Sequence, residues 1–196
     1  MTTTPTLPSS GLSVLTLPMR DPRVKPLLDE LAVEYTTRYG DLFGSGGAAE
    51  ELNRYPAGEF AAPHGALLIV QDNGETVAGG AFRRYDSRTA ELKRIWTHSA
   101  HRRRGLARFV LAELEALAGR RGYRKVYLTT GPRQPEAKHL YLSTGYEAQF
   151  DLSADPETIG PLAFTKDLPG ANHGANPAAS PAALVGRRGP GTRASG

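Results

Sequence analysis

The sequence predicts an α/β domain in which helices flank a single mixed sheet. Two observations lead to this fold class: apolar residues alternate between strand-like and helix-like spacing along the chain, and short turns separate three consecutive strand-like runs in its middle. The length is a third, since 196 residues suffice for one domain with its own core and flanking tails. No internal repeat is visible in the sequence.

The N-terminal part predicts one strand and one helix. GLSVLTLP at 11–18 indicates the strand, and apolar residues at helical spacing predict the helix over 22–40. A Gly-rich stretch with GSGG at 44–47 follows, and a short helix is expected near 48–54. Because no Gly-Lys-Ser/Thr follows these glycines, a flexible loop is favoured over a phosphate-binding loop.

The middle of the chain predicts three antiparallel strands. GALLIVQ and ETVAGGAFRRY flank the turn at 72–74, where Asn73-Gly74 between apolar runs is typical of a hairpin. A second turn at 86–87 leads to TAELKRIWT at 89–97.

The C-terminal part alternates helices and strands. An apolar stripe predicts a helix that begins near Gly105 and ends in the basic GRRG of 119–122. KVYLTT at 125–130 is typical of a buried strand, and a short helix is expected over 135–145, with Pro135 at its first position. YEAQF and PLAFTKDL predict two closing strands.

Composition sets the boundaries of the domain. Residues 169–196 are dominated by Ala, Gly and Pro and cannot bury enough apolar surface to offset their ordering entropy. We therefore expect disordered tails at 1–10 and 169–196 around a domain at 11–168. Three of the four excess positive charges lie in the C-terminal tail. The nearly neutral domain thus argues against a nucleic-acid partner.

The sequence also predicts a cytoplasmic protein without a membrane segment or metal. The start, MTTTPTLPSS, lacks the pattern of a signal peptide, and the longest clean apolar run, ALLIV, is too short to span a bilayer. There is no cysteine, which excludes disulfides and a cysteine-bound acyl-enzyme. The five histidines are scattered without the spacing of a metal site.

The segment HRRRG at 101–105 joins a predicted strand to a predicted helix. A solvated basic turn is one interpretation of it, and a polynucleotide-binding patch is another. The position of the segment favours a third interpretation, an anion-binding site. The free N–H groups and the positive dipole end of a helix N-terminus attract anions, whereas arginines at that end are electrostatically unfavourable unless an anion binds beside them. A glycine at this point lets the anion approach the main chain. The segment therefore predicts a seat for a diphosphate.

Two motifs in this part of the chain resemble one known family. Arg102-x-x-Gly105-x-Ala107 resembles the [Q/R]-x-x-G-x-[G/A] signature of the GNAT N-acetyltransferases, and PEA-x-x-x-Y-x-x-x-GY resembles the family's N-x-x-A-x-x-x-Y-x-x-x-G-[FY] segment. The resemblance covers roughly 11–168. The chain departs from the pattern at four positions, which are occupied by Ser99, Arg103, Ala107 and Gln134.

The resemblance implies a fold, a co-substrate and a set of binding residues. It implies the GNAT fold, a central, mostly antiparallel mixed sheet flanked by helices and splayed between the fourth and fifth strands. Acetyl-coenzyme A would enter this splay as co-substrate, without a metal. The residues expected to bind it are Trp96, Thr97, Arg102, Arg103, Arg104, Gly105, Leu106, Ala107 and Arg108.

Acetyl transfer to an amine requires a base, stabilisation of an oxyanion and an acid for the departing thiolate. The resemblance places Tyr141 where the family has the tyrosine that faces the thiol, and a protonated phenol suits the acid; the alternative is a half-buried packing aromatic. Glu91 is the candidate base, with a pKa raised by apolar neighbours, although a water relay or a merely polar strand position are alternatives. A main-chain N–H near 95–97 would bind the oxyanion, and Trp96 would anchor its strand to the core.

The predicted activity is direct transfer of an acetyl group to a primary amine in a ternary complex. The partner would be a small-molecule or protein amine, and a homodimer is compatible with the family. The alternatives are a non-catalytic module of this fold that senses acetyl-CoA or binds a protein, and an RNA-associated protein. The first helix and the following loop are the expected border of the acceptor pocket, with Tyr35, Tyr39, Phe43, Phe60 and His64 as the candidate residues, although ordinary packing explains these residues equally well.

Overall fold

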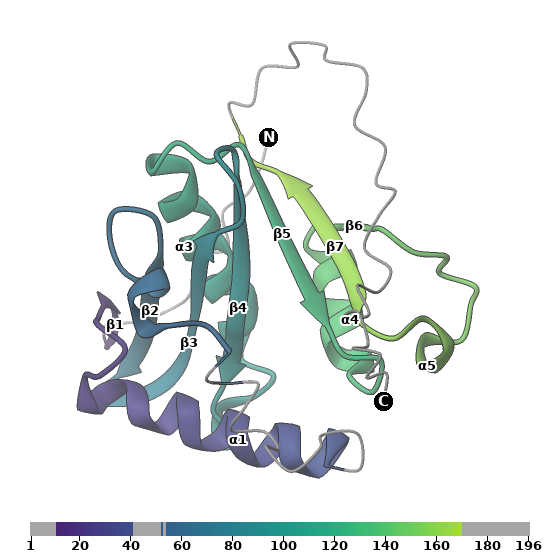
Figure 1. Ribbon diagram of the computed structural model, residues 1–196. Coiled ribbons are helices and arrows are strands. Elements are labelled where there is room, and N and C mark those ends of the chain that lie inside the picture. Colours follow the sequence, from purple (N-terminus) through teal and green to yellow (C-terminus); the bar gives the residue numbers. More distant parts are fainter. Residues whose placement is uncertain (1–10, 41–51, 53, 170–196) are drawn as a thin grey trace, which may run out of the picture.

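The computed structural model describes residues 11–40, 52 and 54–169, and in them a seven-stranded sheet forms the centre of the fold (Figure 1). The strand order is β1-β2-β3-β4-β5-β7-β6, and only the β4–β5 pair is parallel. The predicted mixed, mostly antiparallel sheet is confirmed. The GSGG loop, most of the short helix near 48–54, and the predicted tails apart from Pro169 lie outside the described residues.

The first three strands form an antiparallel meander. β1 (Leu12–Thr16) pairs with β2 (Ala66–Asp72), and β2 pairs with β3 (Glu75–Arg84). Asn73 and Gly74 join β2 to β3 with φ angles of 50° and 87°, the left-handed backbone that a two-residue hairpin needs. The predicted hairpin is confirmed.

Helices cover both faces of this sheet. Along β2, Leu68 and Val70 pack into the cluster formed with α3 (Leu106–Arg120), whereas the alternate residues Leu67 and Ile69 pack on the opposite face. That opposite face carries the one-turn helices η1 (Pro22–Val24) and η2 (Ala57–Phe60) and the helix α1 (Lys25–Tyr39). The strand buries both of its faces, which explains its continuous apolar run.

The fourth and fifth strands part soon after they begin. β4 (Thr89–Thr97) and β5 (Lys125–Thr130) are paired at only three positions, ending at Glu91 and Tyr127. Beyond them β4 stays paired with β3 through a bulge, at which Arg94 takes a φ of 59°. Figure 1 shows the gap widening between β4 and β5. This splay is the one expected from the family resemblance.

The C-terminal half completes the sheet and adds α4 on its α3 side. β5 pairs along its whole length with β7 (Leu162–Asp167), which also pairs with the short β6 (Glu147–Ala148). α4 (Pro135–Ser143) contributes Tyr141 to the core shared with α3.

Three short helices were not predicted: η2, η3 (Ser99–His101) and α5 (Pro156–Ile159). The signal for α5 is present in the sequence, because Asp155 caps its N-terminus and Pro156 occupies its first position.

Side chains from α1 tie it to the loop between β5 and α4. Arg38 donates to the Arg133 carbonyl at 2.6 Å and pairs with Glu136, and the Tyr39 hydroxyl accepts from the Arg133 N–H at 3.2 Å. Gly131 makes this close approach possible, since a Cβ at this position would lie 1.9 Å from the Tyr39 hydroxyl oxygen. The contacts bridge the open end of the splay.

Gly131→Ala should destabilise the protein by about 1–3 kcal/mol, because the added methyl group must displace the Tyr39 ring. Urea unfolding measures this loss. Gly119→Ala is the matched control, because nothing lies within 4 Å of a Cβ at this position in α3. The control should gain about 0.5–1 kcal/mol from helix propensity. An unchanged midpoint for Gly131→Ala would contradict the proposed bridge.

Candidate active site

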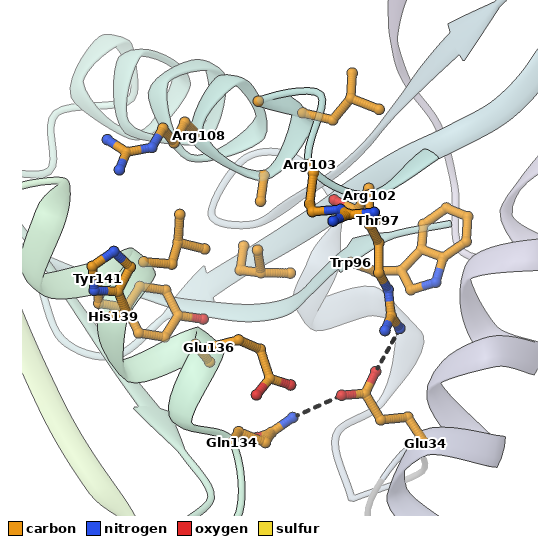
Figure 2. A pocket seen from close by; sticks show the side chains of 16 residues that line it. Glu34, Trp96, Thr97, Arg102, Arg103, Arg108, Gln134, Glu136, His139 and Tyr141 are labelled. Atoms are coloured by element: carbon orange, nitrogen blue, oxygen red, sulfur yellow. Dashed lines mark hydrogen bonds and ion pairs between the residues drawn. The ribbon is translucent and has the colours of Figure 1, made fainter. Parts of the chain in front are cut away.

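A cavity of about 600 Å³ opens where β4 and β5 part (Figure 2). Its walls come from α1, the end of β4, the start of α3 and α4. The residues that line it are Glu34, Ile95, Trp96, Thr97, Arg102, Arg103, Gly105, Leu106, Ala107, Arg108, Gln134, Glu136, Ala137, His139, Leu140 and Tyr141.

The N-terminus of α3 forms one wall of the cavity. Gly105 is the residue before the first helical turn, with a φ of 78°, and no side chain caps the helix. The first N–H groups of an α-helix have no partner within the helix, so an uncapped N-terminus is suited to bind an anion. Because left-handed backbone costs an L-residue about 1–2 kcal/mol, glycine suits this position. The predicted helix start at Gly105 is confirmed.

The four arginines at 102–108 do not all line the cavity. Arg102, Arg103 and Arg108 line the cavity, whereas Arg104 does not. The Arg104 guanidinium instead binds Asp72 at 2.8 Å and contacts the His101 ring nitrogen Nδ1 at 2.6 Å, which holds it against the β2–β3 turn. The structure therefore brings the other predicted arginines together and leaves Arg104 apart.

The end of β4 forms a second wall. Trp96 is buried against α1, and its indole N–H donates to Glu30 at 3.0 Å, so its predicted anchoring role is confirmed. The neighbouring Thr97 hydroxyl oxygen is buried and has no hydrogen-bond partner in the part of the chain that the structure describes. An unpaired buried hydroxyl costs free energy that a ligand in the cavity can recover.

Tyr141 reaches the cavity from α4 and is 6% exposed. Its ring packs on Tyr146 and Phe164, and its hydroxyl makes no hydrogen bond to any described residue. Burial raises the pKa of Tyr141 above its ordinary value, and the nearby Tyr35 and Glu34 raise it further. The phenol therefore stays protonated at neutral pH and can donate to a group in the cavity.

Glu91 lies where β4 leaves β5 and is 4% exposed. Its carboxylate accepts from Arg83 at 2.7 Å and pairs with Lys93 at 2.9 Å. The expectation of apolar neighbours is thus wrong, because two cations, Arg83 from β3 and Lys93 from β4 itself, reach the buried carboxylate. Glu91 is also absent from the residues that line the cavity, unlike Tyr141.

Comparison with known proteins identifies the family. Residues 28–146 match the family described as Acetyltransferase (GNAT) family. The chain belongs to the GNAT family. A curated GNAT relative is the uncharacterized N-acetyltransferase YsnE of Bacillus subtilis (strain 168), with 35% identity over 92 residues, which are 44% of this chain and 61% of YsnE. The chain thus spans less than two thirds of that relative.

Solved structures confirm the GNAT fold. The PaiA N-acetyltransferase of Thermoplasma acidophilum in complex with coenzyme A has a TM-score of 0.61 and 12% identity, over 81% of this chain and 99% of that one. A GNAT family acetyltransferase of Elizabethkingia anophelis with acetyl-CoA bound has a TM-score of 0.56 and 15% identity, over 82% of this chain and 100% of that one.

Sequence reasoning named no role in the GNAT site for Glu34, Glu136 or His139, all of which line the cavity. Gln134, noted only as a departure from the family motif, accepts from Thr130 and the Gly131 N–H and donates to Glu34 at 3.2 Å. Glu136 is the second residue of the PEA motif, so the motif could have pointed to it as a site residue. Glu34 is one of several acidic residues in the first helix, and only the tertiary structure distinguishes it.

The structure describes only some of the aromatic residues that were predicted to border the acceptor pocket. Phe60 is a buried core residue and Tyr39 binds the β5–α4 loop, so packing explains both. Phe43 lies outside the described residues.

The described residues contain neither a candidate membrane-spanning helix nor a candidate metal-binding group. None of their helices is long and apolar enough to cross a membrane. They also contain no group of three or more His, Cys, Asp or Glu that could hold a metal ion.

Tyr141→Phe should reduce the loss of stability at high pH. A tyrosine whose pKa is raised by folding contributes stability that is fully present below its unfolded pKa of about 10 and is lost as the pH rises toward the folded value. The wild type should therefore lose more unfolding free energy than the variant above about pH 10. Urea unfolding between neutral pH and pH 11 measures this, and parallel losses in both proteins would contradict the burial of the phenol.

Proposed function

We propose that this chain transfers the acetyl group of acetyl-CoA directly to a primary amine in a ternary complex. One observation carries the proposal: the uncapped N-terminus of α3, with Arg102, Arg103 and Arg108 around it, opens into the same cavity as the Tyr141 hydroxyl. An anion-binding wall and a protonated phenol are what a diphosphate-bearing thioester requires. Family membership supports acetyl transfer as the general chemistry.

The residues present fit coenzyme A. The free N–H groups of α3 and the three arginines would hold its diphosphate, and the unpaired Thr97 hydroxyl offers a polar contact beside it. After Glu91 the β5-facing edge of β4 has no strand partner in the part of the chain that the structure describes, so its backbone can bind the amide-containing arm of the coenzyme as an added strand. When bound, the thioester supplies the activated acetyl group.

Tyr141 is the proposed acid. Its hydroxyl faces the cavity without a hydrogen-bond partner among the described residues and is held protonated by burial, so it can donate to the departing sulfur. Main-chain N–H groups of Ile95–Thr97 are the proposed donors to the oxyanion. Because the chain has no cysteine, the amine is proposed to attack the thioester itself.

Glu91 is the proposed base and acts through water. An alkyl amine is almost wholly protonated at neutral pH and must lose a proton before it attacks. Glu91 places a buried carboxylate at the apex of the splay, where β4 and β5 part, but outside the lining of the cavity. A water relay therefore has to carry the proton from the amine to Glu91.

Tyr141→Phe should bind acetyl-CoA with unchanged affinity and lower kcat by about 10²–10⁴-fold, because it removes the donated proton and little volume. Calorimetry measures the affinity, and release of free thiol across a library of amines measures the turnover. Failure of the wild type to bind acetyl-CoA would exclude the proposed function. Binding without transfer to any amine would instead support a sensing module.

Glu91→Gln should lower kcat by about 10²–10⁴-fold, because the amide cannot accept the proton. It should also cost about 1–3 kcal/mol of stability by removing the charged partner of Arg83 and Lys93. Arg83→Gln is the matched control, since it breaks the same ion pair and leaves the carboxylate. If both variants keep the wild-type kcat and lose similar stability, Glu91 only holds β3 and β4 together.

A further inference from the structure

Glu34 stands between two cavities. It lines the cavity described above and a neighbouring one of about 400 Å³, which continues along α1 to Asp29 and Ser99. Arg102 is the other residue shared by both cavities. Figure 2 shows Glu34 and Gln134 on the side of the cavity opposite Arg108, with Arg102 reaching across to Glu34.

The two carboxylate oxygens of Glu34 have different surroundings. Oε1 is within 3.2 Å of both the Arg38 Nε and the Gln134 amide nitrogen. Oε2 faces Arg102 at 3.9 Å, which is beyond hydrogen-bond distance, and accepts no hydrogen bond from the described residues. A carboxylate oxygen can accept two hydrogen bonds, so Oε2 retains the capacity to bind a further donor.

The Arg102–Glu34 pair is weak and competes with the coenzyme. The Arg102 side chain is 54% exposed, and an ion pair so exposed contributes little. A diphosphate at the α3 N-terminus offers Arg102 more negative charge and bidentate hydrogen bonds. Binding of the coenzyme would therefore draw Arg102 away and leave Glu34 with Arg38 as its remaining cation.

We propose that Glu34 determines acceptor specificity: it holds Arg102 in the free enzyme, and after coenzyme binding its Oε2 binds a positively charged group of the acceptor other than the amine that is acetylated. This inference rests on the proposed function. Of the three carboxylates in the second cavity, Asp29 pairs with Lys25 and Glu30 accepts from Trp96 and Ser99, so once Arg102 turns to the diphosphate it is Glu34 that has an oxygen left for a cation. An aliphatic diamine is the simplest acceptor of this class.

The bound cation is not the amine that reacts, for an electrostatic reason. A carboxylate beside an ammonium stabilises its protonated form, which opposes the deprotonation that attack requires. Glu34 is therefore suited to a group that remains charged throughout the reaction. The amine to be acetylated lies farther inside, near the thioester and Tyr141.

The first test uses coenzyme A alone. Calorimetry should show that Glu34→Gln binds coenzyme A about two- to fivefold more tightly than the wild type, because Arg102 no longer has a competing anion. Asp167→Asn is the matched control, since it removes the same charge from a pair with Lys125 at the opposite end of β5. The control should bind like the wild type. Equal affinity in all three proteins would overturn the competition.

The second test titrates coenzyme-saturated protein with 1,4-diaminobutane and with butylamine. The wild type and Asp167→Asn should bind the diamine at least about tenfold more tightly, and Glu34→Gln should lose this preference. Glu34→Asp should restore part of it, which separates the role of the charge from a change in folding. Equal binding of both amines to the wild type, or a preference that survives Glu34→Gln, overturns the inference and leaves the proposed function intact. No binding of coenzyme A to the wild type would overturn both.

Discussion

The early parting of β4 and β5 is the constraint on which the site depends. Each strand keeps its outer neighbour: β4 continues along β3, and β5 stays paired over all six of its residues with β7. The two inner edges therefore run apart with backbone groups that no strand satisfies. Backbone groups inside a protein need hydrogen-bond partners, so the edges exposed by the splay are suited to a ligand that carries amides or to water.

The open end of the splay is closed by α1 rather than by the sheet. Arg38 and Tyr39 bind the β5–α4 loop, and Gln134 binds Glu34, so the half of the fold that carries Tyr141 is tied to the half that carries α3. The separation of these two functional groups is thus set by polar side-chain contacts across the gap. Substitutions in α1 should consequently alter the site without touching the coenzyme.

The parts of the fold that depend on local pattern were predictable from the sequence. Strand and helix periodicity, the Asn73-Gly74 hairpin and the helix start at Gly105 each involve neighbouring residues, and the structure confirms them. The surroundings of Glu91 were not predictable, because Arg83 approaches it from another strand in a register that the sequence does not display. The same holds for Glu34, whose partners Gln134 and Arg102 are distant in the chain.

The arginine run shows how a local conformation divides one motif into two functions. Arg103 takes a φ of 62°, which an L-residue adopts only at a cost, and the chain direction changes there. Arg102 and Arg104 consequently serve different surfaces: the first faces the cavity and Glu34, and the second is held by Asp72 outside it. Charge counting treats the run as one basic patch. The backbone instead turns Arg102 and Arg103 to the cavity, whereas Arg104 binds Asp72 and holds the loop that carries them, so a residue that does not line the cavity positions two that do.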